Sequence, residues 1–149
     1  MTEKAWNWRE EESNRLAYLG DAVYELALRR HLLERSKARG DQLQRQATYY
    51  VSAPAQAELL HRLQAEGFFT EEEWQFLKYV RNRRPGTVAR HCRPADYRWA
   101  TALEAYCGRL YMEGNSGRLE TFFAALFRLG EEERQRRLAE TEARRDGSS

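Results

Sequence analysis

Hydrophobic residues recur along the chain at intervals of three and four, the spacing of an amphipathic α-helix, and no stretch shows the sustained alternation of a β-strand. Glycines, prolines and capping residues interrupt this pattern and divide it into segments. The pattern predicts helices over about 14–34, 41–50, 54–66, 70–81, 95–113 and 117–141. We therefore expect an all-α domain over residues 14–141, preceded by a docked arm or short helix at 1–13 and followed by a flexible tail at 142–149.

The first long helix, 14–34, is apolar around most of its circumference. One stripe along it consists of Leu16, Leu19, Val23, Leu26 and Leu33. Further apolar residues widen the stripe: Ala17, Tyr24, Ala27 and Leu28. A helix that is apolar this far round is usually central in its domain, and it has more apolar surface than one core face requires.

Local signals mark the start of the helix at 70–81 clearly. Thr70 and Glu73 have the spacing of a capping box, and Phe69 and Trp74 occupy the two positions of a hydrophobic staple. Gly67 precedes them and can end the previous helix in the left-handed conformation. These residues predict a tight turn between two helices.

The longest irregular segment, 82–94, contains two prolines and a glycine and is rich in arginine. Residues 81–98 carry six arginines against one aspartate, a local charge of +5, and residues 29–45 carry six basic residues against two acids, a local charge of +4. Arginine on a loop is well suited to phosphodiester oxygens, although a run of charge can equally be a solvated face. Our candidate RNA-binding residues are Arg81, Arg83, Arg84, Arg90 and Arg93.

Two carboxylates are candidates for chemistry. Asp21 follows Gly20 inside a helix, where glycine costs roughly 1 kcal/mol relative to alanine and usually indicates the close approach of another backbone. Glu104 lies in an aromatic-rich helix, one turn before Gly108. Two such acids on different helices could hold one Mg²⁺ and leave positions for a phosphate oxygen and a water. Taken singly, Asp21 could form a solvated pair with Glu25, and Glu104 could pair with an arginine.

Composition excludes several classes of protein. The 149 residues suggest one domain, and no apolar run approaches the ~20 residues of a membrane span or resembles a secretory signal. Cys92 and Cys107 fit no disulfide framework or common zinc spacing, so a reducing cytoplasm is the default. His31, His61 and His91 are too scattered for a zinc site, and no phosphate-binding loop or serine-hydrolase motif occurs. A net charge of +2 argues against a protein that binds nucleic acid by being basic throughout.

Residues 16–26 closely resemble the hallmark helix of ribonuclease III domains, and in particular the short Mini-ribonuclease III form, which lacks a double-stranded-RNA-binding domain. The resemblance extends from about residue 14 to 128. Further matching motifs are Val51-Ser52-Ala53 with Gln56-Ala57, the turn at 67–73, Arg81-Asn82 leading to Gly86-Thr87, Tyr97-Arg98, and Thr101-Ala102-Leu103-Glu104-Ala105 followed by Gly108.

The resemblance implies a helical domain that forms a homodimer and hydrolyses double-stranded RNA with Mg²⁺, or Mn²⁺ in its place, leaving 5′-phosphate and 3′-hydroxyl ends. It implies that Asp21 and Glu104 are the catalytic and metal-binding carboxylates. For the Mini form it implies cytoplasmic maturation of the large-subunit (23S) ribosomal RNA precursor, and it leaves open whether a ribosomal protein assists. Longer members carry further acids where this chain has Asn14, Ala17 and Thr101, a difference that the Mini form shares.

Two other classes of function remain compatible with the sequence. One is a noncatalytic RNA-binding or ribosome-assembly protein on the same fold, suggested by the missing acids. The other is a helical protein-interaction module whose basic segment is only solvated. Cleavage of duplex RNA in the presence of Mg²⁺ would separate the enzyme from both.

Overall fold

A computed structural model describes residues 5–83 and 93–147. Within these ranges the secondary structure consists of α-helices and one turn of 3₁₀-helix, with no strand, which confirms the predicted all-α class. The elements are η1 (Trp8–Glu10), α1 (Ser13–Arg35), α2 (Gly40–Val51), α3 (Ala53–Ala65), α4 (Glu71–Arg81), α5 (Pro94–Met112) and α6 (Ser116–Gly147).

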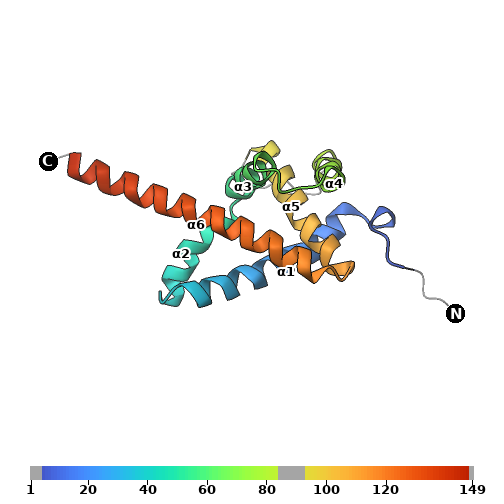
Figure 1. Cartoon of the computed structure of the whole chain (residues 1–149), viewed down its shortest axis with the longest axis horizontal. Coiled ribbons are helices and arrows are strands. Elements are labelled where there is room, and N and C mark those ends of the chain that lie inside the picture. Colours follow the sequence, from blue (N-terminus) through green and yellow to red (C-terminus); the bar gives the residue numbers. More distant parts are fainter. Residues whose placement is uncertain (1–4, 84–92, 148–149) are drawn as a thin grey trace.

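The helices are arranged around the crossing of α1 and α5, which is the most extensive contact between elements (Figure 1). Helices α3 and α4 pack against α5, whereas α2 folds back from the end of α1 and contacts α6. Helix α6 runs across the molecule and projects beyond the other helices at its C-terminal end. It continues to Gly147 instead of ending near Thr141, so residues 142–147 are helical rather than a flexible tail.

Two glycines allow the backbones of α1 and α5 to touch. A Cβ atom on Gly20 would overlap the carbonyl oxygen of Glu104 and lie 2.8 Å from the backbone nitrogen of Gly108. A Cβ on Gly108 would in turn overlap the carbonyl oxygen of Leu16. The close approach predicted from a glycine inside a helix is therefore confirmed.

This contact determines which side of α1 is buried. The buried arc repeats every three or four residues and comprises Ser13, Leu16, Ala17, Gly20, Tyr24, Leu28 and Leu32. The prediction that Leu26 and Leu33 belong to the buried stripe is wrong, because these side chains are 73% and 70% exposed. Periodicity alone cannot identify the core face of a helix that is apolar around its whole circumference. Here the core face is set by Gly20, which lies directly against the backbone of α5.

The turn before α4 forms as predicted, and residues 8–10 of the N-terminal segment form a 3₁₀ turn that packs on α4. Trp8 lies in the 3₁₀ turn η1 and packs edge-on against Phe76 of α4, with ring centroids 4.9 Å apart. Thr70 and Glu73 form the predicted capping box, and Phe69 stacks on Trp74 as the staple. Gly67 has a φ of 77° just after the end of α3.

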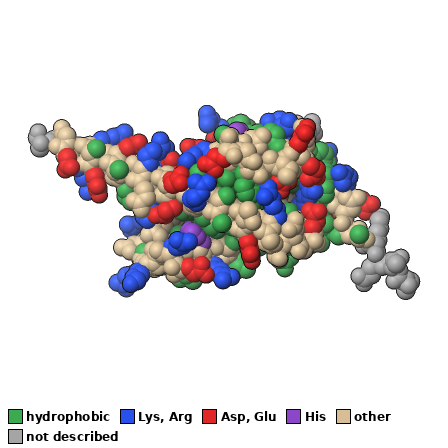
Figure 2. Space-filling view, viewed as in Figure 1, with side chains coloured by type: hydrophobic (Ala, Val, Ile, Leu, Met, Phe, Trp, Pro, Cys, Tyr) green, Lys and Arg blue, Asp and Glu red, His purple; other side chains and the backbone are tan. Residues whose placement is uncertain are grey.

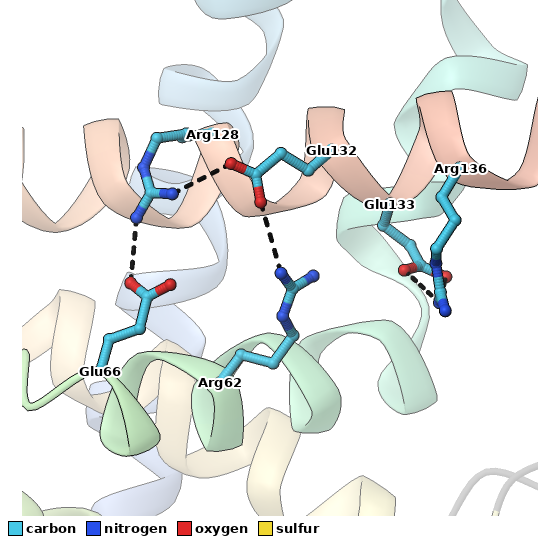
Figure 3. A network of polar contacts seen from close by, with 6 residues as sticks. All are labelled: Arg62, Glu66, Arg128, Glu132, Glu133 and Arg136. Carbon is cyan, nitrogen blue, oxygen red and sulfur yellow. Dashed lines mark hydrogen bonds and ion pairs between the residues drawn. The ribbon is translucent and has the colours of Figure 1, made fainter.

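Charged side chains of both signs are interspersed on the surface shown in Figure 2, including along α6. Figure 3 shows how some of them join α6 to α3. Arg128 reaches both Glu66 and Glu132, and Glu132 also meets Arg62. Exposed pairs of this kind each contribute little stability, so the network mainly keeps the two helices in register.

Glu73 is a buried acid that joins three helices. Arg118 of α6 donates two hydrogen bonds to its carboxylate at 2.6 and 3.0 Å, and Tyr106 of α5 donates another. Burial raises the pKa of Glu73, but the hydrogen bonds from Arg118, Tyr106 and the Thr70 backbone outweigh it and lower this pKa to about 2. The ionised acid therefore stabilises the folded state above the pKa of the unfolded chain, and this contribution is lost as the pH falls toward 2.

We expect Gly20→Ala to lower the free energy of unfolding by about 2–3 kcal/mol or to prevent folding, because the collision with α5 outweighs the ~1 kcal/mol gain in helix propensity. Gly117→Ala is the matched control, since a Cβ at this position in α6 would meet no atom within 4 Å. Chemical denaturation followed by circular dichroism measures both. A wild-type midpoint for Gly20→Ala would contradict the backbone contact.

We expect Glu73→Gln to destabilise the protein by on the order of 3 kcal/mol at neutral pH, because it leaves the Arg118 guanidinium without its counter-charge. The stability of the variant should also change less than that of the wild type between pH 4.5 and 2. Urea titrations at pH 7, 5 and 3 measure both effects. Glu72→Gln serves as the control, because the Glu72 side chain is about half exposed and its partner Arg109 keeps a second acid, Glu113, at 2.9 Å.

Candidate active site

The helix crossing brings the two predicted carboxylates into one cavity. Asp21 directly follows Gly20 on α1, and Glu104 is the residue whose carbonyl group faces that glycine from α5. Both side chains line a cavity of about 330 Å³. Its other walls come from α1, α2 and α3 and include Tyr24, Glu25, Leu28, Leu43, Ala47 and Gln56. The glycine contact is thus also the element that positions the acids.

The two acids interact electrostatically. Burial, together with the negative charge of Asp21, raises the pKa of Glu104 to about 8. The pKa of Asp21 is also raised, by partial burial and by Glu25. A pair of carboxylates that resist ionisation together is a common feature of active sites, and a bound cation would relieve the repulsion between them.

The donors present fit a divalent cation that takes only part of its coordination from the protein. Across residues 5–83 and 93–147, no group of three or more His, Cys, Asp or Glu side chains is arranged to hold a metal ion. Asp21 and Glu104 supply carboxylate oxygens, the donors that Mg²⁺ prefers, and Mg²⁺ commonly completes its shell with water and phosphate. A cation bound between the two carboxylates would reduce their repulsion, so the pair is suited to such a site.

Three other groups that could take part in chemistry contact side chains elsewhere in the fold. Cys107 is buried and unpaired, and burial raises its pKa, which makes it an inert thiol. His31 packs on Phe127 with ring centroids 4.8 Å apart, and His61 contacts Trp99 at 4.7 Å. Cys92 and His91 lie outside the described residues.

The arginine candidates are divided between the two ends of the basic segment. The Arg81 guanidinium lies 4.7 Å from the ring centroid of Trp99, which stacks on Trp74, and its Nε donates to Asn82. Arg81 is therefore already engaged within the fold. Two of the others are exposed: Arg83 lies 5.4 Å from the ring centroid of Tyr79, and Arg93, just before α5, pairs with Asp96 at 3.2 Å. Arg84 and Arg90 lie outside the described residues.

Sequence reasoning missed three polar residues of the cavity, Tyr24, Gln44 and Gln56. The sequence places Tyr24 on the apolar face of its helix and in a family motif, places Gln56 in a family motif, and gives Gln44 no role. A signal for Gln56 exists, because it lies one turn before Leu59 and Leu60 on the buried face of α3.

Comparison with known families identifies the class of protein to which this all-α fold with two acids at a glycine-mediated crossing belongs. The family model described as "Ribonuclease III domain" matches residues 14–115. The chain belongs to the ribonuclease III family.

Its relatives place it in the Mini-ribonuclease III branch of that family, as its motifs predicted. It is 41% identical over 106 residues to Mini-ribonuclease 3 of Streptococcus pneumoniae, covering 71% of this chain and 83% of that protein. It is 41% identical over 110 residues to Mini-ribonuclease 3 of Symbiobacterium thermophilum, covering 74% and 83%. A crystal structure of a Fusobacterium nucleatum protein superimposes with a TM-score of 0.69 at 26% identity, covering 80% of this chain and 94% of that one.

Family membership makes this protein an endoribonuclease that acts on double-stranded RNA. It favours the enzyme over the noncatalytic RNA-binding protein and the interaction module. Ribonuclease III enzymes generally depend on a divalent metal ion. Within the part of the chain that the structure describes, no helix is long and apolar enough to cross a membrane.

Proposed function

We propose that this endoribonuclease uses Asp21 and Glu104 to cut double-stranded RNA in a Mg²⁺-dependent reaction, with Mn²⁺ able to substitute, and that it matures the ends of the 23S ribosomal RNA precursor in the cytoplasm. The observation that carries the proposal is the shared cavity, in which the charge of Asp21 contributes to a Glu104 pKa of about 8. The precursor substrate rests on the relationship to Mini-ribonuclease III.

The two acids differ in their exposure to solvent. Asp21 is exposed and available to the RNA backbone, whereas Glu104 is only partly exposed. Together they would hold Mg²⁺, which supplies a polarised phosphate and an activated water when bound. The protein contributes a fixed spacing between two carboxylates, which the glycine contact enforces. Hydrolysis would leave 5′-phosphate and 3′-hydroxyl ends.

Arginines at the two ends of the basic segment would grip the duplex. Arg83 and Arg93 are exposed at the end of α4 and just before α5. With Arg84 and Arg90, they would contact phosphates of the duplex, and Arg81 would join them by leaving Trp99 and Asn82. Such contacts position the duplex without selecting a sequence.

We also infer that the protein is a homodimer that associates through the outer face of α1. Tyr18, Leu26 and Leu33 are 86%, 73% and 70% exposed and recur every seven or eight residues on this helix. Exposed large apolar side chains in one strip usually mark an interface. Because Asp21 lies on the same helix, a dimer of this kind would bring two cavities near one duplex.

We expect Asp21→Asn and Glu104→Gln each to reduce cleavage by about a thousandfold, a loss of several kcal/mol in transition-state stabilisation, without loss of folding or of duplex binding. The assay uses labelled duplexes from both ends of the 23S precursor, an unrelated duplex, and Mg²⁺ or a chelator. Glu25→Gln is the matched control, because Glu25 lines the same cavity but pairs with Arg29 at 2.7 Å. Full cleavage by either acid variant would exclude the assignment, and equal rates on all duplexes would exclude the precursor as a preferred substrate.

We expect Leu26→Glu to convert the dimer to a monomer at micromolar concentration, because it places a charge within the apolar strip. Light scattering after gel filtration measures the mass. Leu138→Glu is the control, since Leu138 is 44% exposed on the projecting part of α6. A wild-type protein that is already monomeric would contradict the dimer.

A further inference from the structure

Tyr79 is a large aromatic side chain that remains on the surface of α4. It is 41% exposed, whereas Phe76 and Val80 of the same helix are buried. Its ring nevertheless has two close neighbours. Trp8 of η1 packs edge-on against it with ring centroids 5.7 Å apart, and the Arg83 guanidinium lies 5.4 Å from its centroid. The ring therefore joins the N-terminal turn to the start of the arginine-rich segment.

Trp8 is held in place by α4 and α5. Its ring packs edge-on against Phe76 at 4.9 Å, and the Arg109 guanidinium of α5 lies 5.0 Å from its centroid. Arg109 is itself fixed, because it also lies 4.8 Å from the ring centroid of Phe76 and pairs with Glu72 of α4 at 2.8 Å. Trp8 is thus a well-packed support for the exposed ring of Tyr79.

Arg83 is placed through both its backbone and its side chain. Its backbone N–H donates to the carbonyl oxygen of Val80 at 3.0 Å, so the chain still follows a helical turn beyond the end of α4. Arg83 comes four residues after Tyr79, the spacing at which side chains meet on a helix surface. A guanidinium can rest on an aromatic ring by its flat face and still offer the N–H donors in its plane to a phosphate.

Arg83 differs from the other two candidate RNA-binding arginines that the structure describes. Arg81 donates from its Nε to the neighbouring asparagine at 3.0 Å, and Arg93 pairs with Asp96 at 3.2 Å. The Arg83 side chain forms no hydrogen bond or ion pair with another residue in 5–83 or 93–147, although Glu12 lines the same surface hollow. Within these ranges its donors are held in place without being used by the fold.

We propose that Tyr79, supported by Trp8, is a positioning residue that holds the Arg83 guanidinium ready for a backbone phosphate of the duplex. The proposal rests on the proposed function, since it assumes that the ligand is double-stranded RNA and that Arg83 contacts its backbone. An arginine that is ordered before RNA binds loses less conformational freedom when the contact forms. The ring therefore raises duplex affinity without touching the RNA, and η1 contributes through the side chain that it supports.

The test measures binding of a labelled RNA duplex to the full chain by fluorescence anisotropy, with a chelator present to prevent cleavage and at several salt concentrations. Arg83→Ala should weaken binding about tenfold and reduce the slope of log affinity against log salt concentration by about one, because it removes one phosphate contact. Tyr79→Leu should weaken binding about threefold to tenfold. In the double variant it should add no loss to that of Arg83→Ala, because the ring acts only through this arginine.

Tyr79→Phe and Tyr49→Leu are the matched controls. Tyr79→Phe keeps the ring and should bind the duplex as tightly as the wild type. Tyr49 of α2 is a partly buried tyrosine whose ring centroid lies 5.6 Å from the Arg137 guanidinium of α6, so it forms the same kind of pair outside residues 81–98. Tyr49→Leu should leave duplex affinity unchanged. Trp8→Leu, which removes the support but keeps the ring, should weaken binding less than Tyr79→Leu.

Wild-type duplex affinity in Tyr79→Leu would overturn the proposal. So would an equal loss from this substitution with and without the Arg83 side chain, or an equal loss in Tyr49→Leu. Wild-type affinity in Trp8→Leu would overturn the role of η1. If Tyr79→Leu does not fold, Tyr79→Met takes its place in the same comparison. Failure of the proposed function gives a different result, in which the wild type does not cut the duplex when Mg²⁺ is added.

Discussion

The direct contact between the backbones of α1 and α5 is the constraint on which the rest of the structure depends. Gly20 and Gly108 face each other across it, and a Cβ atom on either would collide with the opposite helix. The contact sets the rotation of α1 about its own axis and therefore sends Leu16 and Tyr24 into the core. The same rotation leaves Asp21 beside Glu104 and turns Leu26 outward. One steric requirement thus produces the core face, the acidic cavity and the exposed strip.

The Asp21–Glu104 pair and the buried acid Glu73 have opposite effects on the stability of the fold. The repulsion between Asp21 and Glu104 opposes folding unless a proton or a cation is present. Glu73 does the reverse, because its ionised form is held by Arg118 and Tyr106 and stabilises the folded state. The fold therefore contains one acid that is kept charged and stabilises it, and one pair of acids that repel each other. Burial raises the pKa of both Glu73 and Glu104. The pKa of Glu73 is nevertheless lowered, because Arg118 and Tyr106 donate hydrogen bonds to it, whereas the charge of Asp21 raises the pKa of Glu104 further.

Local signals in the sequence predicted much of the fold. The capping box at Thr70 and Glu73 and the glycine at 20 each depend on short-range geometry, and each is confirmed. The predictions for the buried arc of α1 and for the end of α6 were wrong. The buried arc depends on contact with α5, which is distant in the sequence. The end of α6 depends on ion pairs along one exposed helix. The acids could be named from spacing and family resemblance, but Gln56 could not be assigned to the cavity, since α3 and α1 come together there only in the folded chain.

The aromatic stack at the end of α4 gives the molecule an optical property. Trp74 stacks on Trp99, the Arg81 guanidinium covers Trp99, and Trp8 packs on the other side chains of the same helix. Three of the four tryptophans therefore lie in α4 or against it. Indole emission depends strongly on neighbouring charge and stacking, and the arginine-rich segment begins at this helix end. The intrinsic fluorescence of the protein consequently arises mainly from indoles in or against α4, the helix that leads into the arginine-rich segment.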